Sequence, residues 1–170
     1  MRNFKNVSLT KQKALSEAFP ELLNFYVCTE VADYKQVSVS VFDHWLSQEE
    51  AIKRIDNSSS IQCDNNNELL HKFIVSLAQS TETYVVKLRG RNTDKKATFR
   101  EFTSHSGMVN SLIPKHHFSA DTHRFVLVLP QLNLVYFESS DFTHHIYFKR
   151  EEDLESVSKL ANENGLSIIK

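Results

Sequence analysis

The stretch RFVLVLPQLNLVYFESSDFTHHIYFK, residues 124–149, decides the fold of this chain. Three runs rich in apolar, β-branched and aromatic residues predict three strands, at 124–129, 132–138 and 142–149. The links between them, Pro130-Gln131 and residues 139–141, are too short to join anything but antiparallel neighbours. The first run is apolar at successive positions, which is typical of a central strand covered on both faces. The stretch therefore predicts an antiparallel meander.

Outside the meander, β-branched and aromatic residues predict five more strands, at 24–31, 37–41, 84–88, 97–103 and 166–169. The run at 37–41 alternates strictly between valine and serine, which is the pattern of a half-buried strand. The run at 24–31 lies at hairpin distance before it. A turn at 92–95 joins the next two strands into a second hairpin.

Helical periodicity and capping signals predict four helices, at 9–23, 48–56, 69–78 and 151–164. Pro20 perturbs the first helix, and Ser47 and Glu50 have capping-box spacing at the start of the second. Gly165 stands where a C-terminal cap of the last helix is expected. Two segments are predicted to lack regular structure, the polar stretch 57–67 and the histidine-rich stretch 104–123.

This order of elements predicts an α+β fold in which residues 1–170 form a single domain. We expect a mostly antiparallel sheet, built from hairpins and the three-strand meander, with the helices mainly on one face. At 170 residues and 41% hydrophobic, the chain is long enough to bury a core of its own.

The scarcity of glycine excludes several classes of site. Phosphate loops need residues without a Cβ, and the chain has only Gly90, Gly107 and Gly165, no two of them close together. No P-loop, dinucleotide fingerprint or nucleophile elbow is present, and no cofactor is expected. The net charge of −1 gives no global field that would attract nucleic acid or a membrane. Two cysteines and the lack of a long apolar run predict a soluble, cytoplasmic protein.

A local cluster of cations lies on the predicted hairpin at 84–103. Six basic side chains come from its first strand, its turn and its returning strand: Lys87, Arg89, Arg91, Lys95, Lys96 and Arg100. Lys87, Arg89 and Arg91 alternate, so they share the strand face opposite Tyr84 and Val86. Such a basic hairpin suits the phosphate groups of a nucleic acid or nucleotide, or an acidic protein. The alternative interpretation is an ordinary solvated face.

A second cluster contains imidazoles and a carboxylate within eight residues: His116, His117, Asp121 and His123. These side chains are good ligands for zinc, iron or nickel. No H-E-x-x-H or C-x-x-C pattern accompanies them. His144 and His145 alternate on one predicted strand and therefore face opposite ways, so they do not readily bind one ion together.

Trp45 lies between a predicted strand and a capped helix. It can pack in the core, line a pocket or anchor an interface, and core packing is the expectation. Cys63 falls in the predicted polar loop, where it could be exposed, but no neighbouring base or cation would activate its thiol, so a structural or incidental role is expected. The richness in phenylalanine suggests that some aromatic surface is covered by self-association, most simply in a two-fold homodimer.

These observations support three hypotheses about function. The first is a non-enzymatic binding protein that recognises another protein or a small molecule through a sheet edge, the basic hairpin or an aromatic surface, without contact to a membrane. The second is a binder of nucleic acid or nucleotide phosphate that uses the cations of 87–100. The third is a metal-dependent enzyme that uses the histidine-rich segment 116–123.

Overall fold

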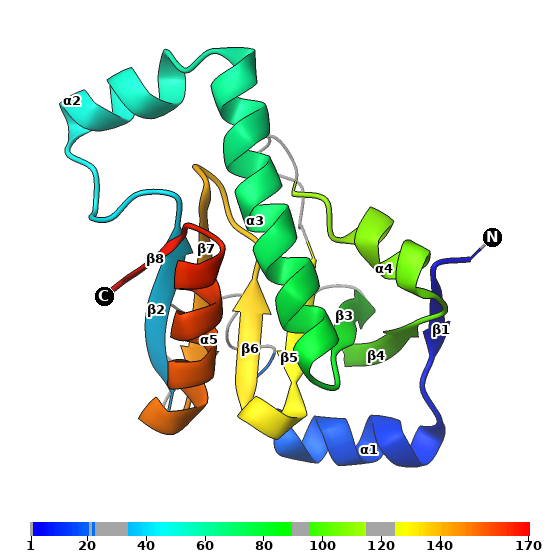
Figure 1. Cartoon of the computed structure of the whole chain (residues 1–170). Coiled ribbons are helices and arrows are strands. Elements are labelled where there is room, and N and C mark those ends of the chain that lie inside the picture. The colour runs from blue at the N-terminus through cyan, green and yellow to red at the C-terminus, as the bar shows by residue number, and fades with distance from the viewer. Residues whose placement is uncertain (1, 21, 23–33, 90–95, 115–124) are drawn as a thin grey trace.

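Figure 1 shows the computed structural model of the chain, which describes residues 2–20, 22, 34–89, 96–114 and 125–170, with only the backbone of Leu88 and Arg89. The strands of these residues form one antiparallel sheet in the order β1-β4-β3-β5-β6-β7-β2-β8. They are β1 (Phe4–Asn6), β2 (Lys35–Ser40), β3 (Tyr84–Arg89), β4 (Lys96–Phe102), β5 (Val126–Leu129), β6 (Leu134–Phe137), β7 (Thr143–Phe148) and β8 (Ser167–Ile169). The predicted α+β class is confirmed.

The predicted meander, β5-β6-β7, lies at the centre of this sheet. Val128 pairs with Val135 across β5 and β6, and Tyr136 pairs with Ile146 across β6 and β7. All four residues of β5 are buried, as predicted for a strand that is covered on both faces. The link after β5 is a short 3-10 turn, Pro130–Leu132, which ends at a left-handed asparagine, Asn133.

The helices are α1 (Leu9–Ala18), α2 (Gln48–Ala51) continued by a π-helical turn (Ile52–Asp56), α3 (Ser60–Ser80), α4 (His105–Ser111) and α5 (Glu151–Glu163). Apolar residues of α3, α4 and α5 pack on one face of the sheet with Tyr136 and Ile146. Leu15 of α1 packs on the other face with Val86, Val128 and Val135. The helices therefore lie mainly on one face, as expected.

Helix α3 begins about nine residues earlier than its apolar periodicity predicts. Ser59 accepts a hydrogen bond from the backbone N–H of Gln62, and the Gln62 side chain accepts one from the N–H of Ser59. This capping box satisfies backbone N–H groups of the first helical turn, which would otherwise bond to water. The helix therefore begins at Ser60, and most of the expected loop at 57–67 is helical. Figure 1 shows α2 and the first turns of α3 projecting beyond the sheet.

Two other expectations are also corrected. Part of 104–123 is the regular helix α4, which Ser104 caps by accepting a hydrogen bond from the N–H of Gly107 at 3.0 Å. Strand β2 is buried on both faces over its last four residues rather than half-buried. Its serines tolerate burial because their hydroxyls have partners, among them His145 and Thr143. The predicted strand at 24–31 lies outside the described residues.

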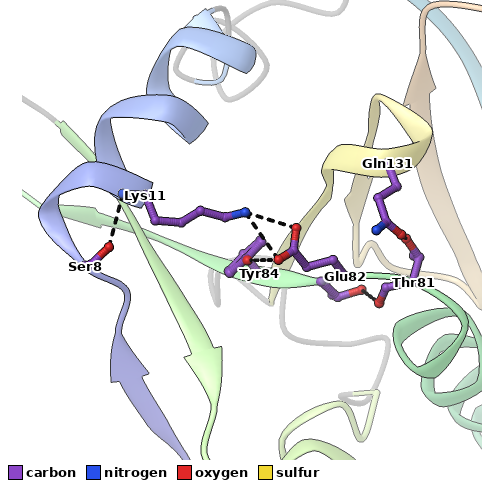
Figure 2. A network of polar contacts seen from close by, with 7 residues as sticks. Ser8, Lys11, Thr81, Glu82, Tyr84 and Gln131 are labelled. Carbon is purple, nitrogen blue, oxygen red and sulfur yellow. Dashed lines mark hydrogen bonds and ion pairs between the residues drawn. The ribbon is translucent and has the colours of Figure 1, made fainter.

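Figure 2 shows how α1 is joined to the start of β3. Glu82 accepts hydrogen bonds from Lys11 Nζ at 3.0 and 3.2 Å and from the Tyr84 hydroxyl at 2.6 Å. The ammonium group of Lys11 also lies 5.1 Å from the centroid of the Tyr84 ring. Because these groups are partly exposed, the ion pair contributes about 1 kcal/mol at most. The network therefore orients α1, while buried Leu15 and Phe19 hold it to the sheet.

Candidate ligand pocket

A pocket of about 250 Å³ lies at one end of the sheet, where three segments distant in sequence meet. One wall comes from the segment between β2 and α2, from α2 and from its π-helical continuation, one from the turn between β6 and β7 and from β7 itself, and one from β8. The lining residues are Phe42, His44, Trp45, Leu46, Ala51, Ile55, Ser139, Ser140, Asp141, Thr143, His145 and Ile169. An apolar floor with a few polar groups is typical of small-molecule sites.

Trp45 lies in the wall of this pocket and is 56% exposed, so the expectation that it packs in the core is wrong. Its indole Nε1–H donates a hydrogen bond to the backbone carbonyl of Lys170 at 3.0 Å. Ser47, two residues further on, caps α2 through a complete capping box with Glu50. The hydrogen bond to Lys170 fixes the edge of the indole, and the helix cap fixes the backbone just after it, so Trp45 is held in the pocket wall.

The turn between β6 and β7 forms the opposite wall and carries an unusual backbone. Asp141 and Phe142 both have positive φ angles, 60° and 55°, and the N–H of Thr143 donates to the carbonyl of Ser140 at 3.1 Å. Two successive left-handed residues are usually glycine or asparagine, so each costs on the order of 1–3 kcal/mol here. Burial of the Phe142 ring in the core offsets this cost and holds Asp141 at the pocket.

His145 supplies the half-buried polar group of the pocket. Its Nδ1 lies 3.0 Å from the Ser38 hydroxyl of the neighbouring strand β2. Burial lowers the pKa of His145 below its ordinary value of 6.5, so the imidazole is neutral at pH 7. A neutral imidazole has one donor and one acceptor, and no residue of the described part of the chain bonds to Nε2. This nitrogen is therefore available to a ligand.

His44 lies at the rim between two carboxylates. Its Nδ1 is 2.7 Å from Asp43 Oδ1 and its Nε2 is 3.1 Å from Glu50 Oε1. The hydrogen bond to Asp43, followed by that to Glu50, raises the pKa of His44 above 6.5. The backbone N–H of Ser47, which donates to Glu50 at 2.9 Å, is the largest of the causes that lower the pKa of Glu50 to about 2.

These shifts predict a pH range in which the rim is most stable. The raised pKa of His44 contributes stability that is complete below pH 6.5 and is lost as the pH rises through the folded value. The lowered pKa of Glu50 contributes stability that is complete above pH 4.5 and is lost as the pH falls toward 2. We therefore expect the emission of the single tryptophan, Trp45, to be constant between pH 4.5 and 6.5 and to change above that range. In His44→Gln the alkaline change should vanish; its persistence would contradict the assignment.

The structure places the predicted basic hairpin only in part. Arg91 and Lys95 lie outside the described residues, as does the side chain of Arg89. Lys87 and Lys96 are exposed, and Lys87, opposite Thr98, shares its face with the half-buried Arg100. Of the hairpin cations whose side chains the structure describes, none lines the Trp45 pocket. Strands β3 and β4 pair as expected, and the role of the hairpin in binding stays a prediction.

The predicted metal ligands His116, His117, Asp121 and His123 also lie outside the described residues. Within the ranges that the structure describes, no three His, Cys, Asp or Glu side chains converge as they do in a metal site. His144 and His145 face opposite sides of β7: His144 contacts buried Tyr136, and His145 contacts Ser38. The expected separation of these two imidazoles is confirmed.

Cys63 is buried in α3 and only 3% exposed, so its placement in a polar loop is wrong. Its sulfur lies 3.1 Å from the Ser58 hydroxyl, within the turn that precedes the helix. The burial follows from the early start of α3, which turns this position toward the core.

Sequence reasoning missed most of the pocket. In the sequence, His145 is only a poor metal partner of His144, and the pocket residues Ser139, Ser140 and Asp141 are only a short link between strands. Serine and aspartate are ordinary turn residues, and the one unusual sign was the lack of glycine in so short a connection.

Comparisons with known protein families, with curated proteins and with solved structures found no match for this chain. Among the helices that the structure describes, none has the length and apolar character that crossing a membrane requires.

Proposed function

We propose that this protein binds a small organic molecule in the Trp45 pocket. The observation that carries the proposal is the position of the indole, which stands 56% exposed in the wall of a concave site of about 250 Å³. An indole that stands exposed in the wall of a concave site offers a ligand a large, flat contact surface. The strained turn at Asp141 and Phe142 supports the same conclusion, because residues with strained backbone angles are found most often at binding sites and active sites.

The lining defines the class of ligand. The indole face and the side chains of Leu46, Ile55 and Ile169 suit a flat apolar body. His145 Nε2 offers one hydrogen bond, and His44 with its two carboxylates gives the rim a polar edge. A single-ring compound with one hydrogen-bonding substituent fits this volume and this pattern.

The test uses the fact that the chain has one tryptophan. Its indole N–H gives a single resonance, so a proton–nitrogen NMR titration reports on the pocket without assignment ambiguity. Phenol, benzamide and benzimidazole serve as probes. We expect at least one to shift the Trp45 signal saturably, and Trp45→Ala to weaken its affinity about tenfold, because stacking and apolar contact are lost. The affinity in this variant is read from ligand-observed NMR.

Ile61→Ala is the matched control, since Ile61 is also an exposed apolar residue, 71% exposed on α3, and does not line the pocket. It should leave the affinity unchanged. If no probe binds, or if binding survives in Trp45→Ala, the proposal fails. It also fails if the Trp45 signal shifts with protein concentration alone, because a second copy of the chain would then cover the indole.

A further inference from the structure

A second cavity, of about 790 Å³, lies at the opposite end of the sheet, along the pairing of edge strand β1 with β4. Three cations line it, from both strands and from the residues before β1: Arg2, Lys5 and Arg100. The remaining lining residues are Asn3, Phe4, Asn6 and Thr103. Arg100 belongs to the predicted basic hairpin, but Arg2 and Lys5 are about a hundred residues away in sequence and reach it only through the fold.

The N-terminal segment is held firmly at this edge. Asn6 pairs with Arg100 across β1 and β4. The backbone N–H of Thr103 donates to the carbonyl of Asn3 at 3.0 Å, and the Thr103 hydroxyl donates to the carbonyl of Arg2 at 2.7 Å. The Asn3 amide also donates to the Ser111 hydroxyl at 3.1 Å, which ties the segment to α4. The backbone at Arg2 is therefore fixed beside the end of β4.

The charges of this cavity are poorly compensated. In the part of the chain that the structure describes, neither Arg2 nor Arg100 forms a salt bridge. The Nε–H of Arg100 is buried and has no hydrogen-bond acceptor among the same residues. Lys5 pairs with Glu101 at 3.1 Å, but both side chains are largely exposed, so this pair is weak. Lys5 and Glu101 are paired residues and lie on the sheet face opposite to Arg100, so the guanidinium groups of Arg2 and Arg100 are the cations of this cavity that have no carboxylate partner among the described residues.

We propose that this edge cavity binds an oxyanion, namely the phosphate group of a small molecule or of a nucleic acid. A guanidinium group donates two parallel hydrogen bonds to a phosphate, and the buried donor of Arg100 loses no existing bond when its side chain turns to a ligand. The asparagine amides of the cavity add neutral donors.

The basic hairpin distinguishes the two sources of phosphate. Lys96 is four residues before Arg100 on β4, which places it about 13 Å along the strand. One phosphate cannot bridge that distance, but successive phosphates of a nucleic acid strand can. Exposed Lys87 and Lys96 therefore contribute to binding only if the ligand is a polymer.

The experiment measures binding of inorganic phosphate, pyrophosphate and a ten-nucleotide oligo-dT to the full chain by calorimetry. We expect saturable binding of at least one probe, weakened about tenfold by Arg100→Gln and by Arg2→Gln. Arg100→Lys, which keeps the charge and loses the planar fork, should fall between wild type and Arg100→Gln. Lys13→Gln is the control, because Lys13 is 80% exposed on α1 and lies outside the cavity.

Loss of oligo-dT binding in Lys87→Gln and Lys96→Gln, with phosphate binding weak, would identify a nucleic acid as the source. Unchanged binding in those variants would identify a small phosphorylated molecule. If none of the three probes binds, or if Lys13→Gln weakens binding as much as Arg2→Gln, the cavity is not an oxyanion site. Because Arg2 is exposed, its substitution leaves the core intact. Arg2→Gln therefore tests oxyanion binding even if Arg100→Gln unfolds the protein.

Discussion

Replacing Phe73 by alanine should lower the free energy of unfolding by about 3–5 kcal/mol. Phe73 lies on α3, is completely buried, and its ring centroid is 6.3 Å from that of Tyr136 in the centre of the sheet. Truncation removes the apolar contact between the longest described helix and the meander, and it leaves a void that a close-packed core closes only partly.

Urea unfolding followed by circular dichroism measures this effect, and the melting temperature should fall by roughly 10 °C for a chain of this length. Leu9→Ala is the control, because Leu9 is 89% exposed at the start of α1 and should change stability by no more than about 0.5 kcal/mol. A loss below about 1 kcal/mol in Phe73→Ala would show that α3 does not pack on the sheet as described.

Replacing Tyr136 by phenylalanine should cost about 1–3 kcal/mol, although only one oxygen atom is removed. The Tyr136 hydroxyl is hydrogen-bonded to Nδ1 of His144, and both side chains are buried in the core, at 0% and 1% exposed. Burial raises the pKa of Tyr136 well above 10.0, so the hydroxyl keeps its proton at neutral pH. Removing the hydroxyl deprives the buried Nδ1 of His144 of this hydrogen bond. The cost of burying that nitrogen is then no longer offset, and the folded state is destabilised.

A double-mutant cycle separates this pair from the packing around it. His144→Leu alone deprives the Tyr136 hydroxyl of its imidazole partner. The double variant, Tyr136→Phe with His144→Leu, removes both polar groups. The double variant should therefore be destabilised by less than the sum of the single variants, by about 1 kcal/mol or more. Additive losses in urea unfolding would mean that the two groups do not interact.

Much of the fold could be predicted because its signals are local. The meander follows from links too short to join anything but antiparallel neighbours, and the hairpin of β3 and β4 follows from alternation along β3 and the turn signal at 92–95. The capping box at Ser47 and the left-handed Gly165, with a φ of 75°, are also local and were predicted correctly. The capping box at Ser59 has the same kind of signal, but the asparagine-rich sequence after it concealed the early start of α3.

The sequence by itself determined the α+β class, the central meander and the chemical character of its candidate side chains, because hydrophobic period, turn length and capping act within a few residues. Only the tertiary structure decided that Trp45 is exposed and donates a hydrogen bond to Lys170. It also decided that His145 is hydrogen-bonded to Ser38 and that Arg2 lies beside Arg100 at the edge of β4. These contacts join residues about a hundred positions apart. No local rule specifies them, because they depend on the order of strands in the sheet, which is fixed by burial of the whole core.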